Sequence, residues 1–254
     1  MNAGIGGYGY AQARIQARLG RRTATEDLQR ARAARDPAAY LQQLRATSLA
    51  PHVARLTADM DVHEVERRLR EDWAATVEEV ARWLPVAWRP ALRWMRWLPW
   101  LPALQKLARG GRAAAWTRED PVLARIIAAE PARRARVLGG TALAPLQAAV
   151  AAHGDVAAAW RDHWRTLWPD APAAARPLGR LAAEVTAAAS GLGEDTPRGS
   201  SEERLRRVRA RLVRGLRRHP LSPVAACAFL GLEGLDLLEV RGAVTMRVAL
   251  AGTA

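Results

Sequence analysis

One long stripe of apolar residues constrains the fold more than any other feature of this sequence. Between Asp61 and Pro85, apolar side chains recur every three or four residues, the spacing that places them on one face of an α-helix. The stripe consists of Val62, Val65, Leu69, Trp73, Val77, Val80 and Leu84. Asp61 can cap the first turn, Glu64 can return a hydrogen bond to the cap, and Pro85 ends the run. The segment therefore predicts a long amphipathic helix packed on a core.

The same spacing recurs along the rest of the chain, so we expect an all-α fold. Asp36-Pro37 and Asp120-Pro121 each pair a capping residue with a proline suited to the first helical position. Ala, Leu and Arg dominate the composition, and these residues favour helices. Residues 240–250 alternate as a strand would, but no partner strand is evident, so we interpret them as helical.

Glycine-rich breaks suggest how the helices are grouped. Gly110-Gly111 is the best internal boundary, and residues 190–201 have the composition of a linker. We expect one all-helical unit over residues 1–254, built from lobes. The predicted lobes are residues 1–60 with 202–254, residues 61–111 and residues 112–192, with the linker at 193–201.

Composition points to a basic protein of a reducing compartment. The formal net charge is +14, and Lys106 is the only lysine, so nearly all of the positive charge is arginine. Cys227 stands alone, which excludes a disulfide or a thiolate metal site within one chain. The first residues lack the apolar segment of a signal peptide, and no apolar run is long enough to span a bilayer. We therefore expect a cytoplasmic location.

Motifs that would indicate catalysis are absent. Residues 4–9 match the letters of a dinucleotide-binding loop, but no strand can precede Gly4. The sequence contains no phosphate-binding loop of the Walker type, and its five histidines are not spaced as metal ligands. We expect no catalytic residue, no cofactor, no metal and no small-molecule substrate, and hence a protein that is not an enzyme.

Two features of the sequence, an arginine-rich helix and a tryptophan-rich segment, each have more than one functional interpretation. A helix after Ser201 carries an arginine band that could neutralise the phosphates of nucleic acid or lipid, although a solvated helix face is the favoured interpretation. The band comprises Arg204, Arg206, Arg207, Arg209, Arg211, Arg214, Arg217 and Arg218. Tryptophans recur over residues 83–100, where they could form core or contact a protein or a membrane surface.

The start of the chain resembles a known family. Residues 8–17 read Tyr-Gly-Tyr-Ala-Gln-Ala-Arg-Ile-Gln-Ala. This segment is similar to the opening of the V-type (A/V-type) ATPase C/d family, the central-rotor coupling subunits of these enzymes, which reads Tyr-x-Tyr-x-x-Ala-Arg-x-x-Ala. The matching positions are Tyr8, Tyr10, Ala13, Arg14 and Ala17.

The resemblance extends over residues 8–60 and 215–250. The family continues with a tyrosine-leucine helix and a threonine, and ends with a proline-led helix that carries acidic residues and arginine. The corresponding residues here are Tyr40, Leu41, Leu44, Thr47, Pro220, Pro223, Asp236, Leu237 and Arg241. The middle of the chain departs from the family because it lacks an Asp-x-x-Asn-Leu motif, and the chain is short, as in a divergent bacterial member with one lobe reduced.

The resemblance implies a funnel of helical lobes in a pseudo-threefold arrangement. It implies a non-catalytic subunit of a rotary V-type ATPase, coupling the central stalk to the proteolipid ring during proton or sodium-ion transport. The expected partners are the proteolipid ring and the stalk proteins, and the location is peripheral, on the cytoplasmic face of the membrane. The alternative is a basic helical module that binds nucleic acid, which the arginine band alone would favour.

Overall fold

The chain folds entirely into helices over the residues that the computed structural model describes. These are residues 7–22, 25–113, 115–190 and 198–251, and they contain no strand. The first half holds α1 (Gly9–Gly20), α2 (Thr25–Ala33), α3 (Pro37–Arg45), α4 (Ala50–Val53), α5 (Val62–Trp83), α6 (Arg89–Trp94) and α7 (Leu101–Ala108). The second half holds α8 (Leu123–Ala128), α9 (Pro131–Gly139), α10 (Gln147–Ala151), α11 (Val156–Thr166), α12 (Pro172–Ser190), α13 (Arg198–Arg218) and α14 (Pro223–Ala251). The predicted all-α class is confirmed.

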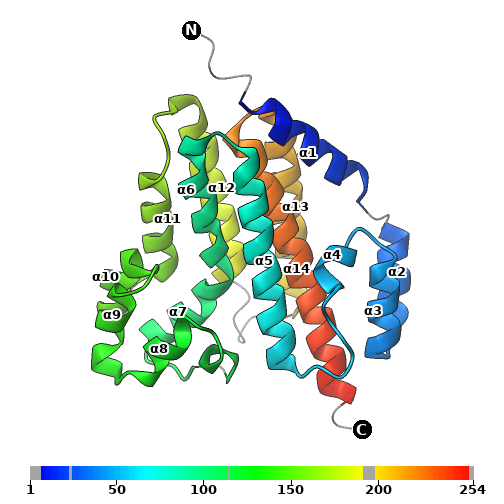
Figure 1. The fold of residues 1–254 in the computed structure, drawn as a ribbon, viewed down its shortest axis with the longest axis horizontal. Helices are drawn as coiled ribbons and strands as arrows, with labels where there is room; N and C mark the ends of the chain where they lie inside the picture. The colour runs from blue at the N-terminus through cyan, green and yellow to red at the C-terminus, as the bar shows by residue number, and fades with distance from the viewer. Residues whose placement is uncertain (1–6, 23–24, 114, 191–197, 252–254) are drawn as a thin grey trace.

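Four long helices form the centre of the molecule. Helices α5, α12, α13 and α14 run beside one another, with α1 to α4 on one side and α6 to α11 on the other (Figure 1). Short 3₁₀ turns complete the connections, namely η1 (Val86–Trp88), η2 (Met95–Trp100), η3 (Ala115–Arg118) and η4 (Ala144–Leu146). The buried apolar side chains, from α1 through α14, belong to one connected cluster. Helices α1 and α3 pack against α14, and the division of the chain into lobes stays a prediction.

The structure agrees with the expected helix near the C-terminus and corrects one end of the predicted linker. Helix α14 continues to Ala251, so residues 240–250 are helical as interpreted, despite their alternating pattern. Helix α13 begins at Arg198, so residues 198–201 are helix rather than linker, and residues 191–197 lie outside the described residues.

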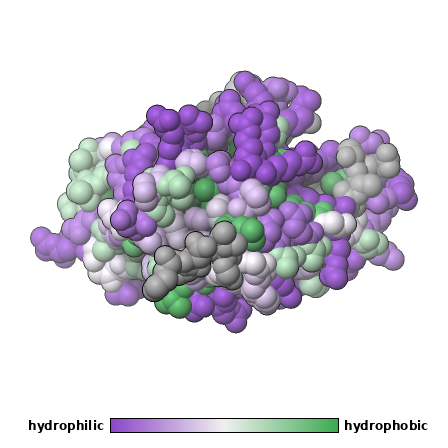
Figure 2. All heavy atoms as spheres, turned by 90° about the horizontal axis from the view of Figure 1, so that it is seen from above, coloured by the Kyte–Doolittle hydropathy of each residue, from purple (hydrophilic) through white to green (hydrophobic). Residues whose placement is uncertain are grey.

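Polar side chains dominate the surface. Figure 2 looks from above onto the molecule and shows hydrophilic side chains over most of this face, with small hydrophobic areas between them. The large apolar side chains that remain exposed include Tyr10, Val86 and Leu221. Among the described helices, none combines the length and apolar character that crossing a bilayer requires.

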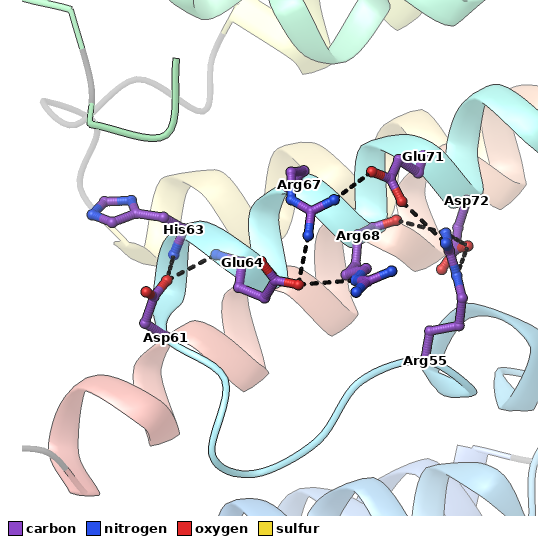
Figure 3. Close-up of polar contacts among 8 residues, drawn as sticks. All are labelled: Arg55, Asp61, His63, Glu64, Arg67, Arg68, Glu71 and Asp72. Carbon is purple, nitrogen blue, oxygen red and sulfur yellow. Dashed lines mark hydrogen bonds and ion pairs between the residues drawn. The ribbon is translucent and has the colours of Figure 1, made fainter. Parts of the chain in front are cut away.

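Helix α5 forms much as its sequence predicts. The Asp61 carboxylate accepts hydrogen bonds from the backbone N–H groups of His63 at 2.7 Å and Glu64 at 2.8 Å, which caps the helix. The expected return bond from Glu64 to the cap is wrong, because this carboxylate pairs with Arg67 at 2.6 Å and Arg68 at 3.0 Å (Figure 3). Neighbouring guanidinium groups one turn away compete for the carboxylate and prevail.

Carboxylates and arginines continue along the solvent-facing side of α5. Arg67 also pairs with Glu71 at 2.8 Å, and Arg55, from the loop after α4, joins Glu71 at 3.0 Å and Asp72 (Figure 3). These side chains are partly exposed, so each pair adds little stability on its own. Their arrangement identifies this face as solvated and directs the apolar stripe of α5 inward.

The tryptophans of residues 83–100 are core residues. Trp83, Trp88, Trp94, Trp97 and Trp100 are each at most 6% exposed. Their indole groups therefore cannot form the protein or membrane contact that the sequence left open, and that interpretation is wrong. Proline-broken short helices let several rings enter one small volume, which a single straight helix would not do.

The tryptophan core offers a matched pair of substitutions. Trp160 and Trp164 are both fully buried, but only the Trp164 indole N–H has an acceptor, the backbone oxygen of Ala91 at 2.7 Å. We expect Trp164→Phe to reduce the free energy of unfolding by about 1–3 kcal/mol more than Trp160→Phe, because only Trp164→Phe leaves a buried acceptor unpaired. Urea denaturation of both variants measures the difference, and equal losses would contradict the assigned hydrogen bond.

Candidate functional site

Helix α14 is the element on which the two ends of the chain meet. It packs against α1 and α3 from the N-terminal end and against α5, α12 and α13. Every residue from Pro223 to Leu232 is buried, whereas the part of the helix from Glu233 to Arg247 carries ionisable side chains at its contacts with neighbours. We call this part of α14, together with the arginines and carboxylates that contact it, the α14 junction.

The start of α14 is tied directly to α1. The backbone N–H of Leu221 donates a hydrogen bond to the side-chain oxygen of Gln12 at 3.0 Å. Leu221 has a φ of 52°, a left-handed conformation that is strained for a leucine. Pro223 follows as the first residue of α14, with a fixed φ that suits a helix start. The predicted motif residue Pro223 therefore acts in the turn that positions α14 beside α1.

Asp236 lies between arginines from both ends of the chain. Arg209 of α13 contacts one carboxylate oxygen at 2.7 Å, and Arg22, which follows α1, contacts the other. Glu239, one turn later, pairs with Arg32 of α2 and with Arg209 at 3.4 Å. Two carboxylates on α14 thus contact three guanidinium groups, which belong to α2, to α13 and to the segment that follows α1.

Arg247 continues the junction toward α3. Its guanidinium donates to the backbone oxygens of Ala34 at 2.8 Å and Arg32 at 2.7 Å, which closes the end of α2. The same group lies over the Tyr40 ring at 4.0 Å from the ring centroid, a cation–π geometry. Tyr40 is 3% exposed, and burial raises the pKa of its phenol. The motif tyrosine therefore acts as a neutral ring that packs on α14.

Arg241 connects the junction to α5. Its guanidinium pairs with one oxygen of Glu66, while Arg70 pairs with the other at 2.7 Å. Arg70 is 8% exposed and lies over the Trp116 ring, 3.4 Å from the centroid. Burial lowers the pKa of Arg70. One buried carboxylate therefore serves two arginines, of which only Arg241 comes from the predicted motif.

Some residues of the N-terminal motif contact other helices, and others are exposed. Tyr8 is half-buried, and Arg14 lies with Arg18 over the Trp83 ring, where both pair with Glu79, Arg14 at 3.2 Å and Arg18 at 2.6 Å. Tyr10, Ala13 and Ala17 point outward, and Tyr10 is 61% exposed.

Thr47 has a local role. Its hydroxyl donates to the backbone oxygen of Leu44 at 2.6 Å and accepts from the N–H of Leu49 at 3.1 Å, which stabilises the turn after α3. The structure thus places Tyr40 against α14, the helix that carries Asp236 and Arg241. Thr47 and the exposed α1 positions lie away from the junction.

Several junction residues were not predicted from the sequence. Arg22, Arg32, Arg247 and Glu66 complete the contacts described above, and Arg209 was singled out only as part of the arginine band. The available signal was an acidic series at three-residue spacing within an apolar helix, formed by Glu233, Asp236 and Glu239. Such a series must find cations when the helix is buried, but the sequence offers too many arginines to identify which ones.

Ion pairs occupy the carboxylates of the junction. Glu66, Asp236 and Glu239 each contact guanidinium groups. Within the described ranges, no three His, Cys, Asp or Glu side chains gather where they could hold a metal ion. Cys227 is fully buried, and burial raises the pKa of its thiol. The arrangement can hold helices in fixed positions.

Comparisons with protein-family models, with curated proteins and with solved structures found no match.

The protonation of Asp236 gives a test of the junction. Burial raises the pKa of Asp236 more than Arg209 and Arg22 lower it, so the folded state binds a proton more readily than the unfolded state. The free energy of unfolding of the unsubstituted protein should then fall as pH rises from the ordinary value of 3.8 through the raised pKa. The amide in Asp236→Asn does not titrate, so this variant should not show the decrease in the free energy of unfolding.

Urea denaturation from about pH 4 upward measures this effect. We expect the free energy of unfolding of Asp236→Asn, relative to the unsubstituted protein, to increase with pH across the window. A relative decrease would mean that the two arginines outweigh burial and that the pKa is lowered.

The lone thiol should report only on unfolding. Cys227 is inaccessible and its raised pKa keeps it protonated, so a thiol reagent at about pH 8 should not label the native protein. Complete labelling in denaturant, followed by mass spectrometry, provides the positive control. Labelling of the native protein at the rate of a free thiol would contradict the described core.

Proposed function

We propose that the chain is a non-catalytic coupling subunit of a rotary V-type ATPase. In this role it connects the central stalk to the membrane proteolipid ring on the cytoplasmic face of the membrane, during proton or sodium-ion transport. The observation that carries the proposal is the meeting of the two family-like chain ends on one helix. Arg22 and Asp236 are 214 positions apart in the sequence and form an ion pair in the α14 junction.

The mechanical character of the fold supports this proposal. A protein that transmits torque needs stiff elements and broad contacts rather than a reactive side chain. The connected core and the side-by-side packing of the long helices α5, α13 and α14 supply stiffness. Arginine contacts occupy the junction carboxylates, which fits a mechanical role better than a catalytic one.

Surface features indicate where partners would bind. Tyr10, Ala13 and Ala17 lie on the exposed side of α1 and coincide with positions of the family motif. Matching residues that do not pack in the core are better explained by contact with another protein than by folding. The net charge of +14 favours an acidic stalk partner or proximity to anionic lipid headgroups.

The nucleic-acid alternative is weaker because the arginine band is partly neutralised. Arg209 faces Asp236, and Arg211 pairs with Glu184 of α12. Arg206 and Arg207 share Glu203 on their own helix. The band therefore does not present a continuous row of unpaired cations to a phosphate backbone.

Affinity purification from gently solubilised membranes tests the proposal. Tagged protein should recover the proteolipid, stalk and nucleotide-hydrolysing subunits, identified by mass spectrometry, at moderate salt and after nuclease treatment. Ala13→Glu combined with Ala17→Glu should reduce that recovery about tenfold, because it adds charge to the exposed α1 face. Ala187→Glu, on the exposed face of α12, is the matched control and should recover the complex normally.

Two results would contradict the proposal. Recovery of nucleic acid and its binding proteins, lost on adding salt, would assign function to the arginine band instead. Recovery of no ATPase component by a correctly folded protein would remove the coupling role altogether.

A further inference from the structure

A pocket lies beside the α14 junction, between α5, η2, α7, α12, α13 and α14. Its volume is about 100 Å³, and it is partly open to solvent. Most of its lining is apolar, with Leu69, Trp73, Leu98, Val185, Leu212 and Leu235 among the contributing residues. The pocket therefore offers an apolar compartment beside the α14 junction.

One end of this pocket is positively charged. Glu66, Arg70 and Arg241 line it together, and the single Glu66 carboxylate pairs with both guanidinium groups. Asp120 lies outside the lining and also attracts Arg70, but its carboxylate accepts hydrogen bonds from the Trp100 indole at 2.8 Å and from a backbone N–H at 2.9 Å. Among the residues that line the pocket, two guanidinium groups thus share the Glu66 carboxylate.

Arg70 has unused hydrogen-bonding capacity at this wall. Its Nε is buried and has no hydrogen-bond partner among the described residues. A buried donor of this kind normally costs free energy unless a ligand or water satisfies it. The aromatic ring of Trp116 holds the guanidinium in place, 3.4 Å from its centroid, so the donor is fixed in position before any ligand binds.

We propose that this pocket binds a small amphipathic carboxylate, with its anionic head at Arg70 and Arg241 and its apolar tail among the surrounding leucine and valine side chains. An engineered apolar cavity of about 150 Å³ takes benzene. A pocket of about 100 Å³ accordingly encloses a few carbon atoms, and the partly open side accommodates the rest of the tail. Medium-chain fatty acids combine this head and tail. The site is independent of the proposed coupling role.

Octanoate is the probe that tests this site on the full-length chain. Isothermal titration should detect saturable octanoate binding and at least about tenfold weaker binding of octan-1-ol and of acetate, because the first lacks the charge and the second lacks the tail. Quenching of tryptophan fluorescence should follow the same affinities, since Trp73 lines the pocket.

Two variants test separately the charge at the pocket and its free volume. Arg241→Gln removes one guanidinium but leaves the Glu66–Arg70 pair, and should weaken octanoate binding about tenfold. Ala189→Leu adds bulk at the pocket lining without a change of charge, and should weaken binding by a similar factor. Arg211→Gln, an equal change of charge at an exposed pair with Glu184, is the matched control and should bind normally. Thermal unfolding verifies that each variant folds.

The proposal would be overturned by any of three results with folded protein. These are no octanoate binding at millimolar concentration, octan-1-ol binding as tightly as octanoate, or equal affinities for Arg241→Gln and Arg211→Gln. Failure of this test leaves the recovery of ATPase components expected for the coupling role unchanged, so the two proposals are distinguishable.

Discussion

The burial of helix α14 is the constraint on which the rest of the structure depends. Its first ten residues, Pro223 to Leu232, are all buried, so the helix is apolar on every side and requires neighbours all around it. Helices α5, α12 and α13 supply most of that cover, and α1 and α3 complete it. Helices α1 and α3 are therefore part of the core rather than an appendage.

The second half of α14 converts this packing into specific connections. Ionisable side chains that approach a core must be paired, because an isolated buried charge is costly. Asp236 pairs with Arg22, which follows α1, and with Arg209 of α13. Arg247 closes α2 and packs on Tyr40, and Arg241 shares Glu66 with Arg70. Each connection fixes the position of a different neighbour relative to one helix. The result is a framework of helices connected through α14.

The sequence predicts local structure here far better than long-range partners. The caps at Asp36 and Asp61 and the stripe of α5 follow from residue spacing, and all are present. The partners of Asp236 do not follow, because an arginine-rich chain offers many cations and the sequence contains no measure of distance between helices. The tryptophans of residues 83–100 were ambiguous for a similar reason, since amphipathic rings suit both a core and an interface. At the charged wall, the spacing of Glu66 and Arg70 by one helical turn is visible in the sequence, but the approach of Arg241 from α14 and of Trp116 from η3 is not.

Hydrogen exchange of the native protein, measured by mass spectrometry, tests the central claim most directly. If α14 organises the fold, its amides between residues 224 and 240 should exchange only through global unfolding, with the free energy found by urea denaturation. The amides of α5 that face it should share that value. Exchange of α14 through a smaller opening, while α5 and α12 stay protected, would mean that the helix is peripheral and that the chain ends do not unite the structure.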